Sequence, residues 1–284
     1  MQITCFGRRD GAGGQALSVI SALAFAENHG CRYLHTPFQS ISHVEGDSRA
    51  WTTRWERFFG LGTGEPPVPF DAEIVSLRQF VRWCRRDPGY VPRPHTVVHS
   101  TGFGYAEVGQ HDISRLQPKL FAKYHSEDKS AIPLHRRTGE AMVAVHVRRG
   151  DVGVGFFRYM PDEPILNTIA HVRAAFHALG RPASFNVYSE GSAEDFKAYS
   201  ELGCVLHLST DTFETFHNLV CADVLVAAPS AFSRTAALLS RGIILSPEEE
   251  WGVHARWIVR APDGSFSQDR LVELLEAHPN QVRV

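Results

Sequence analysis

The sequence has little lysine, few cysteines and no long apolar run. Only 4 of its 29 basic side chains are lysine, so arginine, the better residue for bidentate phosphate contacts, dominates. The five cysteines form no C-x-x-C pair, and their odd number argues against a disulfide framework or a cysteine zinc site. The start MQITCFGRRDG does not look like a signal peptide, and no segment reaches membrane-spanning length. We therefore expect a cytoplasmic protein, with room for peripheral association with a membrane.

Patterns typical of several other protein classes are also missing. The formal net charge of −2 predicts no general attraction to nucleic acid. The 15 histidines include no H-E-x-x-H array, and no Asp-x-Asp triplet occurs, so no metal is expected. A G-x-S-x-G elbow is absent, which argues against an α/β hydrolase. With 43% hydrophobic residues, 284 residues suffice for one large or two modest domains.

Short apolar runs alternate with helix-spaced apolar patterns, which is typical of a parallel α/β sheet. In the first half we predict strands at Met1–Phe6, Cys31–Leu34 and His95–His99, and helices at Gln15–Asn28, Leu77–Arg86 and Ile113–Tyr124. In the second half we predict strands at Met142–Val147, Ser184–Tyr188, Cys204–Leu206, Val224–Ala227 and Ile243–Leu245. Helices are predicted between and after them at Glu163–Leu179, Ala193–Glu201, Thr212–Cys221, Phe232–Ser240 and Leu271–Glu276. A polar stretch at Ser126–Gly139 is interpreted as a linker, which gives domains 1–138 and 139–284.

The segment His146-Val147-Arg148-Arg149-Gly150-Asp151 ends an alternating apolar strand in a strongly polar turn. Ligand-binding groups collect beyond the carboxyl ends of strands in α/β sheets. An arginine placed there can grip a diphosphate through two parallel N–H bonds, and Asp151 can orient it or cap the turn. A surface turn with an Arg–Asp pair would explain the segment taken alone. Its position at the start of the second α/β unit favours an anion site.

A second candidate is the segment Pro229-Ser230-Ala231-Phe232-Ser233, which opens a predicted helix after an apolar strand. Ser230 suits an N-cap. The free N–H groups of the helix start, with the hydroxyls of Ser230 and Ser233, would suit an anion. A simple capping serine explains the same pattern equally well.

Two further loops carry weaker signals. The loop Gly11-Ala12-Gly13-Gly14-Gln15, with Asp10 beside it, would let a ligand approach the backbone, although it lacks the P-loop lysine and the dinucleotide pattern. The strand end Ser189-Glu190-Gly191 offers a carboxylate that could accept from both N1–H and the N2 amine of guanine. An exposed acidic turn is the alternative explanation for the second loop.

In this order, the four segments resemble the fucosyltransferase superfamily of bacterial α1,2-, α1,6- and protein O-fucosyltransferases. Its H-x-R-R-x-D motif is matched by His146, Arg148, Arg149 and Asp151. Its later motifs, and the G-x-G-N-Q loop of the α1,2 enzymes, are similar to the other three segments, with Gly191 where a second acid often stands. The likeness covers about Glu140–Leu245 and residues 1–34.

The resemblance implies an α/β, GT-B-like fold of two Rossmann-like domains with a cleft between them. Residues 1–138 would face the acceptor, and residues 139–284 would bind the GDP-sugar. The resemblance also implies that Arg148 holds the donor diphosphate and that His146 lies beside the guanine. The remaining donor-binding residues would be Arg149, Ser189, Glu190, Ser230, Phe232, Ser233, Gly13, Gly14 and Gln15.

The expected activity is inverting, metal-independent transfer of fucose or a related sugar from a GDP-sugar to a glycan acceptor. Arg148 would neutralise the charge that develops on the leaving diphosphate. The α1,6 enzymes carry a glutamate shortly after the motif, but residues 152–157 contain no acid, so Asp10 and Asp151 are the candidates for the base. Two alternatives stay open: a GT-B transferase with another nucleotide sugar, and a non-catalytic nucleotide- or glycan-binding relative.

Overall fold

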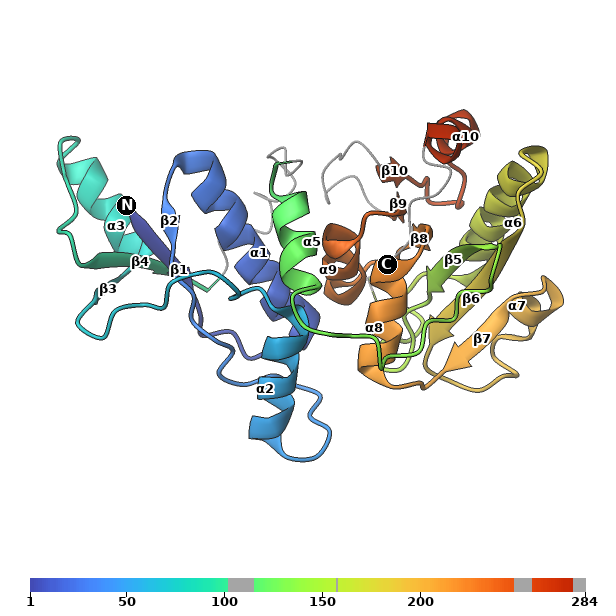
Figure 1. The fold of residues 1–284 in the computed structure, drawn as a ribbon, viewed down its shortest axis with the longest axis horizontal. Coiled ribbons are helices and arrows are strands. Elements are labelled where there is room, and N and C mark those ends of the chain that lie inside the picture. The colour runs from blue at the N-terminus through green and yellow to red at the C-terminus, as the bar shows by residue number, and fades with distance from the viewer. Residues whose placement is uncertain (102–114, 157, 248–256, 278–284) are drawn as a thin grey trace. The chain divides into compact units, whose positions relative to one another are not determined.

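The chain forms an α/β structure with two parallel sheets (Figure 1). A computed structural model describes residues 1–101, 115–156, 158–247 and 257–277. The chain divides into two compact units, Met1–Asp128 and Lys129–Val284. The division therefore falls ten residues before the expected boundary between residues 138 and 139.

The segment expected to be a linker packs on the second unit. The backbone N–H of His135 donates to Asn218 Oδ1 at 2.8 Å, and its ring stacks on His207 with centroids 3.7 Å apart. Arg136 forms an ion pair with Asp223 at 2.6 Å. These polar side chains made the segment look solvent-exposed in the sequence, but their partners lie in the second unit. The linker interpretation was wrong for residues 129–138.

The first unit contains a four-stranded parallel sheet. Its strands, β1 (Gln2–Cys5), β2 (Arg32–Tyr33), β3 (Glu73–Ser76) and β4 (Thr96–Ser100), lie in the order β2-β1-β4-β3. The helices are α1 (Ala12–His29), α2 (Ser48–Phe59), α3 (Leu77–Arg86) and α5 (Gln117–Tyr124). Of the predicted helix Ile113–Tyr124, residues 113 and 114 lie outside the described residues.

Helix α2 and strand β3 were not predicted. Asp47 caps α2 by accepting from the N–H of Ala50, and the helix buries Trp51 and Trp55, which are 5% and 1% exposed. The two tryptophans are four residues apart, so they lie on one face of the helix and form part of the core of this unit. In β3 only the short pair Ile74-Val75 is apolar, which is too little for a period-2 signal.

The second unit contains a six-stranded sheet whose strands all pair in parallel. The strands are β5 (Ala141–His146), β6 (Ala183–Ser189), β7 (Val205–Leu208), β8 (Val224–Val226), β9 (Ile243–Ser246) and β10 (Trp257–Val259). The helices are α6 (Asp162–Ala178), α7 (Lys197–Glu201), α8 (Thr212–Cys221), α9 (Ala231–Leu239) and α10 (Gln268–Ala277). The spatial order β10-β9-β8-β5-β6-β7 is the Rossmann order. In this order β5, β6 and β7 extend the sheet to one side, and β8, β9 and β10 extend it to the other side of β5.

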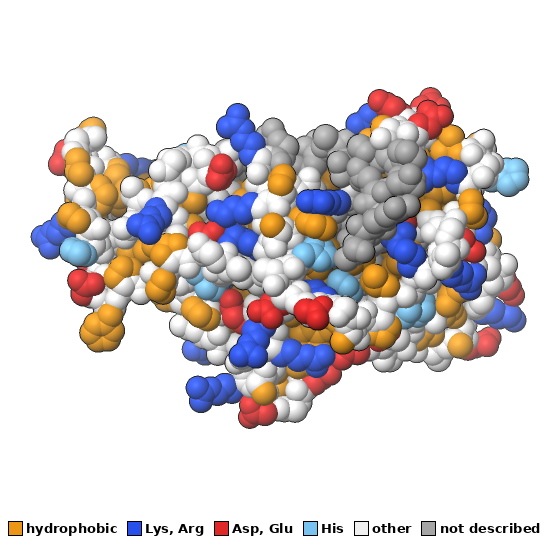
Figure 2. Space-filling view, in the orientation of Figure 1, with side chains coloured by type: hydrophobic (Ala, Val, Ile, Leu, Met, Phe, Trp, Pro, Cys, Tyr) orange, Lys and Arg blue, Asp and Glu red, His pale blue; other side chains and the backbone are white. Residues whose placement is uncertain are grey.

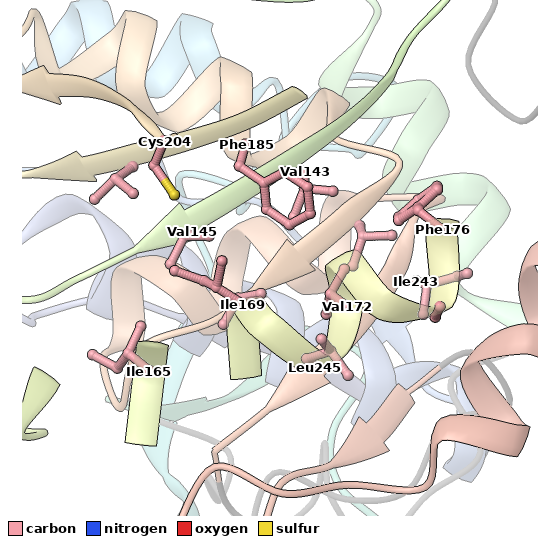
Figure 3. Packing of buried hydrophobic residues seen from close by; sticks show 14 of the residues in the cluster. Val143, Val145, Ile165, Ile169, Val172, Phe176, Phe185, Cys204, Ile243 and Leu245 are labelled. Carbon is pink, nitrogen blue, oxygen red and sulfur yellow. The ribbon is translucent and has the colours of Figure 1, made fainter. Parts of the chain in front are cut away.

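One hydrophobic cluster of the second unit lies on the face of this sheet that α6 and α10 cover. Figure 3 shows Val143 and Val145 of β5 packed against Ile169 and Val172 of α6. All four side chains are fully buried. Helices α8 and α9 pack against each other, and α8 contacts β5. Since both faces of β5 are covered, its interior positions must be apolar.

The surface is mixed in charge. On the face drawn in Figure 2, basic side chains are interspersed with acidic and neutral ones, in keeping with the net charge of −2. Among the residues that the structure describes, no helix combines the length and the hydrophobicity needed to cross a membrane.

Candidate active site

A small pocket opens where the strand order of the second unit reverses. Beyond β5 and β8 the chain turns to opposite sides, which leaves a crevice at the carboxyl ends of these two strands. Both segments that the sequence singled out for anion binding begin here, one after β5 and the other after β8. The pocket is lined by His146, Arg148, Arg158, Met160, Ile165, Val226, Ala227, Ala228, Pro229 and Arg260.

His146 is the last residue of β5 and is held by helix α9. Its Nδ1 lies 2.5 Å from the hydroxyl of Ser233, which also accepts the N–H of Ala228 at 3.1 Å. The hydroxyl can either donate to Nδ1 or accept from an Nδ1–H, so this contact holds the ring with either tautomer. Burial, and next the charge of Arg148, lower the pKa of His146 to about 4. At neutral pH the ring is therefore uncharged and carries a single N–H.

Arg148 is oriented by Asp151. Its Nε and Nη2 donate to the two carboxylate oxygens of Asp151 at 3.3 and 2.8 Å. This fork fixes the plane of the guanidinium. Its Nη1 has no hydrogen-bond partner in the described part of the chain. One edge of Arg148 is thus anchored, and the other is available to a ligand in the pocket.

Arg149 is tied into the protein. Its Nη2 donates to Asp162 at the start of α6 at 2.6 Å, and its Nη1 donates to the carbonyl of Arg148 at 2.9 Å. Its guanidinium also lies over the ring of Tyr159 at 4.5 Å. Three contacts in different directions fix the backbone at Arg148, so Arg149 shapes the loop that presents its neighbour.

Ser189 and Glu190, at the end of β6, lie against the same loop. The Ser189 hydroxyl donates to the carbonyl of Val147 at 2.7 Å. Gly150 has a φ of +76°, and a β-carbon added there would lie 1.6 Å from Oε2 of Glu190. The Glu190 carboxylate thus occupies the space beside Gly150. Position 150 needs a glycine because its φ is positive and because a β-carbon would collide with that carboxylate.

Ser230 and Phe232 begin helix α9. Ser230 is the N-cap, and its hydroxyl accepts the N–H of Ser233 at 3.1 Å. It is only 4% exposed and does not line the pocket, so its hydroxyl serves the cap in this structure. The ring of Phe232 lies between those of His146 and Phe216, at 5.6 and 4.9 Å.

The other candidate residues belong to the first unit. Helix α1 begins at Ala12, so Gly13 and Gly14 lie in its first turn and are buried; the prediction that they precede the helix was wrong. Asp10 is ion-paired with Arg8, and its carboxylate would lie 2.3 Å from a β-carbon on Gly14. The amide of Gln15 donates to the carbonyls of Asp10 and Ser40, at 2.8 and 2.6 Å. This loop is held by its own contacts, and its roles in catalysis and in donor binding stay predictions.

Two pocket arginines escaped the sequence analysis. Arg260 follows β10, a three-residue strand too short to be recognised. Its signal is the one that drew attention to Arg148, a cation directly after an apolar run. Arg158 lies in a loop before α6 and carries no comparable signal in the sequence. Among the described residues, no three His, Cys, Asp or Glu side chains are grouped so that they could hold a metal ion.

The contact between Gly150 and Glu190 can be tested against a matched glycine. Gly150→Ala and Gly180→Ala both force alanine into a left-handed backbone, at a cost of about 1–2 kcal/mol. A β-carbon at Gly180 would meet nothing within 4 Å, so only Gly150→Ala must also displace Glu190. We expect a larger loss of unfolding free energy for Gly150→Ala, measured by denaturant titration. The excess should vanish when Glu190→Ala is present, and an equal excess in both backgrounds would contradict the contact.

The neutral state of His146 predicts a pH-dependent contribution to stability. Its folded-state pKa of about 4 lies below the ordinary value of 6.5. The contribution is therefore complete above about pH 6.5 and is lost as the pH falls towards 4. His146→Asn keeps an acceptor near the Ser233 hydroxyl but does not titrate. The difference in melting temperature between wild type and His146→Asn should shrink from pH 7 to pH 4. The control His177→Asn, on the exposed side of α6, should keep a constant difference in melting temperature from wild type over the same range. Parallel curves for His146→Asn would refute the assignment.

No protein-family model matches the sequence, and no curated protein sequence matches it. The fold matches solved structures. NodZ alpha-1,6-fucosyltransferase soaked with GDP-fucose is 14% identical over 93% of this chain and 96% of its own, with a TM-score of 0.50. Fucosyltransferase NodZ from Bradyrhizobium is 15% identical over 84% of this chain and 93% of its own, with a TM-score of 0.46. The E. coli heptosyltransferase WaaC with ADP is 15% identical over 98% of this chain and 99% of its own, with a TM-score of 0.43. Together with the two parallel sheets, the first of these matches confirms the GT-B-like α/β fold of two Rossmann-like domains.

Proposed function

We propose that this protein is an inverting, metal-independent glycosyltransferase that moves fucose or a related sugar from a GDP-sugar to a glycan acceptor. The observation that carries the proposal is Arg148, fixed by Asp151 at the pocket where the Rossmann-type sheet reverses its strand order. Similarity in fold to NodZ alpha-1,6-fucosyltransferase supports it. In this proposal the second unit binds the donor and the first unit faces the acceptor.

The chemistry requires a positive group at the leaving diphosphate. As the glycosidic bond breaks, negative charge grows on the phosphate oxygen, and a fixed guanidinium stabilises it without reorganising. The Asp151 fork leaves Nη1 of Arg148 available for this role. In this proposal Ser233 donates to Nδ1 of the neutral His146, and the N–H at Nε2 then donates to the same ligand. Since a guanidinium supplies the charge and the chain has no Asp-x-Asp triplet, no metal is required.

Selection of the nucleobase of the donor would depend on Glu190. Its carboxylate lies beside Gly150 on the loop that carries Arg148, where it can accept from two adjacent N–H donors of guanine. Neither uracil nor adenine offers that pair of donors on one edge.

The acceptor hydroxyl needs a general base, and Asp10 and Asp151 remain the candidates. Because Asp151 receives two bonds from Arg148, its position suits orientation of the arginine better than proton removal.

The first test is the choice of donor nucleotide. GDP should raise the melting temperature more than UDP or ADP does at equal concentration. Glu190→Gln should reduce the GDP shift and leave the small UDP and ADP shifts unchanged, because an amide cannot accept twice from the guanine edge. A larger shift with UDP or ADP would instead favour a transferase with another nucleotide sugar.

The second test is the role of Arg148. Arg148→Ala should lower turnover of GDP-fucose, followed as GDP release, by roughly a hundredfold to a thousandfold, the usual cost of losing one preorganised donor. Arg148→Lys keeps the charge but loses the fork, so it should also be strongly impaired. Arg149→Lys is the matched control and should be milder, because that residue supports the loop.

Two outcomes would refute this mechanism. One is near-normal turnover in Arg148→Ala, and the other is loss of wild-type activity when EDTA is added. Binding of GDP without any turnover, across many acceptors, would point to a non-catalytic relative.

A further inference from the structure

Arg260 is a buried cation, and no carboxylate of the described residues pairs with it. The residue follows β10, where its backbone N–H donates to the carbonyl of Ser246 at 2.8 Å, and it is 3% exposed. Its Nη2 donates to the carbonyl of Ala227 at 2.5 Å, and its Nη1 lies 3.4 Å from the hydroxyl of Thr168. Its Nε is buried without a hydrogen-bond partner. Within the described ranges, no Asp or Glu forms an ion pair with it.

This state is unfavourable for the protein alone. A buried guanidinium loses its hydration, and neutral carbonyl and hydroxyl oxygens compensate for that loss only in part. Burial lowers the pKa of Arg260 to about 10, so the group still carries its charge at neutral pH. Two nearby arginines differ from Arg260 in this respect, because Arg148 and Arg149 each form an ion pair with a carboxylate at 2.8 Å or less.

The surroundings of Arg260 favour an anion. It lines the pocket at the strand ends together with Arg148, Arg158 and the neutral His146. None of the side chains that line this pocket is acidic, and Ile165, Val226 and Pro229 give it apolar walls. A positive potential in an apolar pocket is strong because little water screens it. The pocket thus combines a buried, uncompensated charge with several N–H donors.

We propose that Arg260 is a phosphate-binding residue, whose guanidinium receives its counter-charge from a phosphate group of the bound ligand. Arg148 would hold the diphosphate from the β5 side, and Arg260 would hold it from the β10 side of the same pocket. The identity of the ligand as a nucleoside diphosphate sugar rests on the proposed function. The assignment of an anion to Arg260 does not, because it follows from charge and burial alone.

The test compares Arg260→Met with wild type, using inorganic pyrophosphate and GDP as probes in isothermal titration calorimetry and thermal shift. Methionine replaces the aliphatic part of the arginine side chain but carries no charge and no N–H donor. Losing a charge-assisted hydrogen bond should weaken both ligands by roughly ten- to a hundredfold. Without ligand, the variant should melt at or above the wild-type temperature, because the uncompensated charge is gone. Arg173→Met is the matched control, since Arg173 donates to the carbonyl of Leu202 and lies over Phe185, away from the pocket.

Arg260→Lys gives a second, independent measurement if the methionine variant does not fold. It keeps the charge, loses Nε and should bind pyrophosphate several-fold more weakly than wild type. Wild-type affinity for pyrophosphate in either variant would overturn the proposal, and so would a wild-type protein that binds neither probe. Binding of both probes that depends on Arg260, without transfer from GDP-fucose, would support the anion site and count against the proposed function.

Discussion

The architecture of the second unit depends on the burial of β5 on both faces. Val143, Ala144 and Val145 are completely inaccessible to solvent, so no charged side chain can stand within the strand. Polar groups can begin only where the strand ends, and there the chain places His146, Arg148 and Arg149 within four residues. The parallel ladder aligns His146 with Tyr188 of β6 and Val145 with Val226 of β8. The same register therefore brings the β6 and β8 ends, with Glu190 and Ser230, to the edge where the arginines emerge.

The charges at this edge are distributed unevenly. Arg149 is bound to Asp162, which also accepts the hydroxyl of Tyr199, so that pair is already satisfied by the protein. Arg148 shares its charge with Asp151 but keeps one edge available. Arg260 has no acidic partner in the parts of the chain described. Thus Arg149, whose charge is balanced by Asp162, shapes the loop. Arg148 and Arg260, whose charges are less fully balanced, line the pocket, where a bound anion would supply the missing negative charge.

The sequence predicted the fold better than it predicted the contacts of the site. Helices at Leu77–Arg86 and Thr212–Cys221 appear with the predicted bounds, since their apolar spacing and capping residues leave little choice. Strand β10 is three residues long and carries no periodicity, so it was not predicted, and the cation that follows it, Arg260, was not singled out. The position of Glu190 against Gly150 depends on strand pairing between β5 and β6, which one-dimensional spacing does not encode. Local patterns therefore predict elements, whereas partners across strands require the sheet order.

The helix start after β8 shows how a common motif acquires a specific use. Ser230 satisfies the N–H of Ser233, as in many helices, and its hydroxyl is thereby occupied. Ser233 instead connects the N–H of Ala228, just beyond β8, to His146 at the end of β5. This chain of hydrogen bonds connects the two strand ends across the crevice. Because the ring stays neutral, it does not raise the charge of a pocket that already contains three arginines. The hydrogen bonds at the strand ends thus hold the side chains of the pocket in place, and in the proposed function this is the preorganisation that electrostatic stabilisation of a leaving group requires.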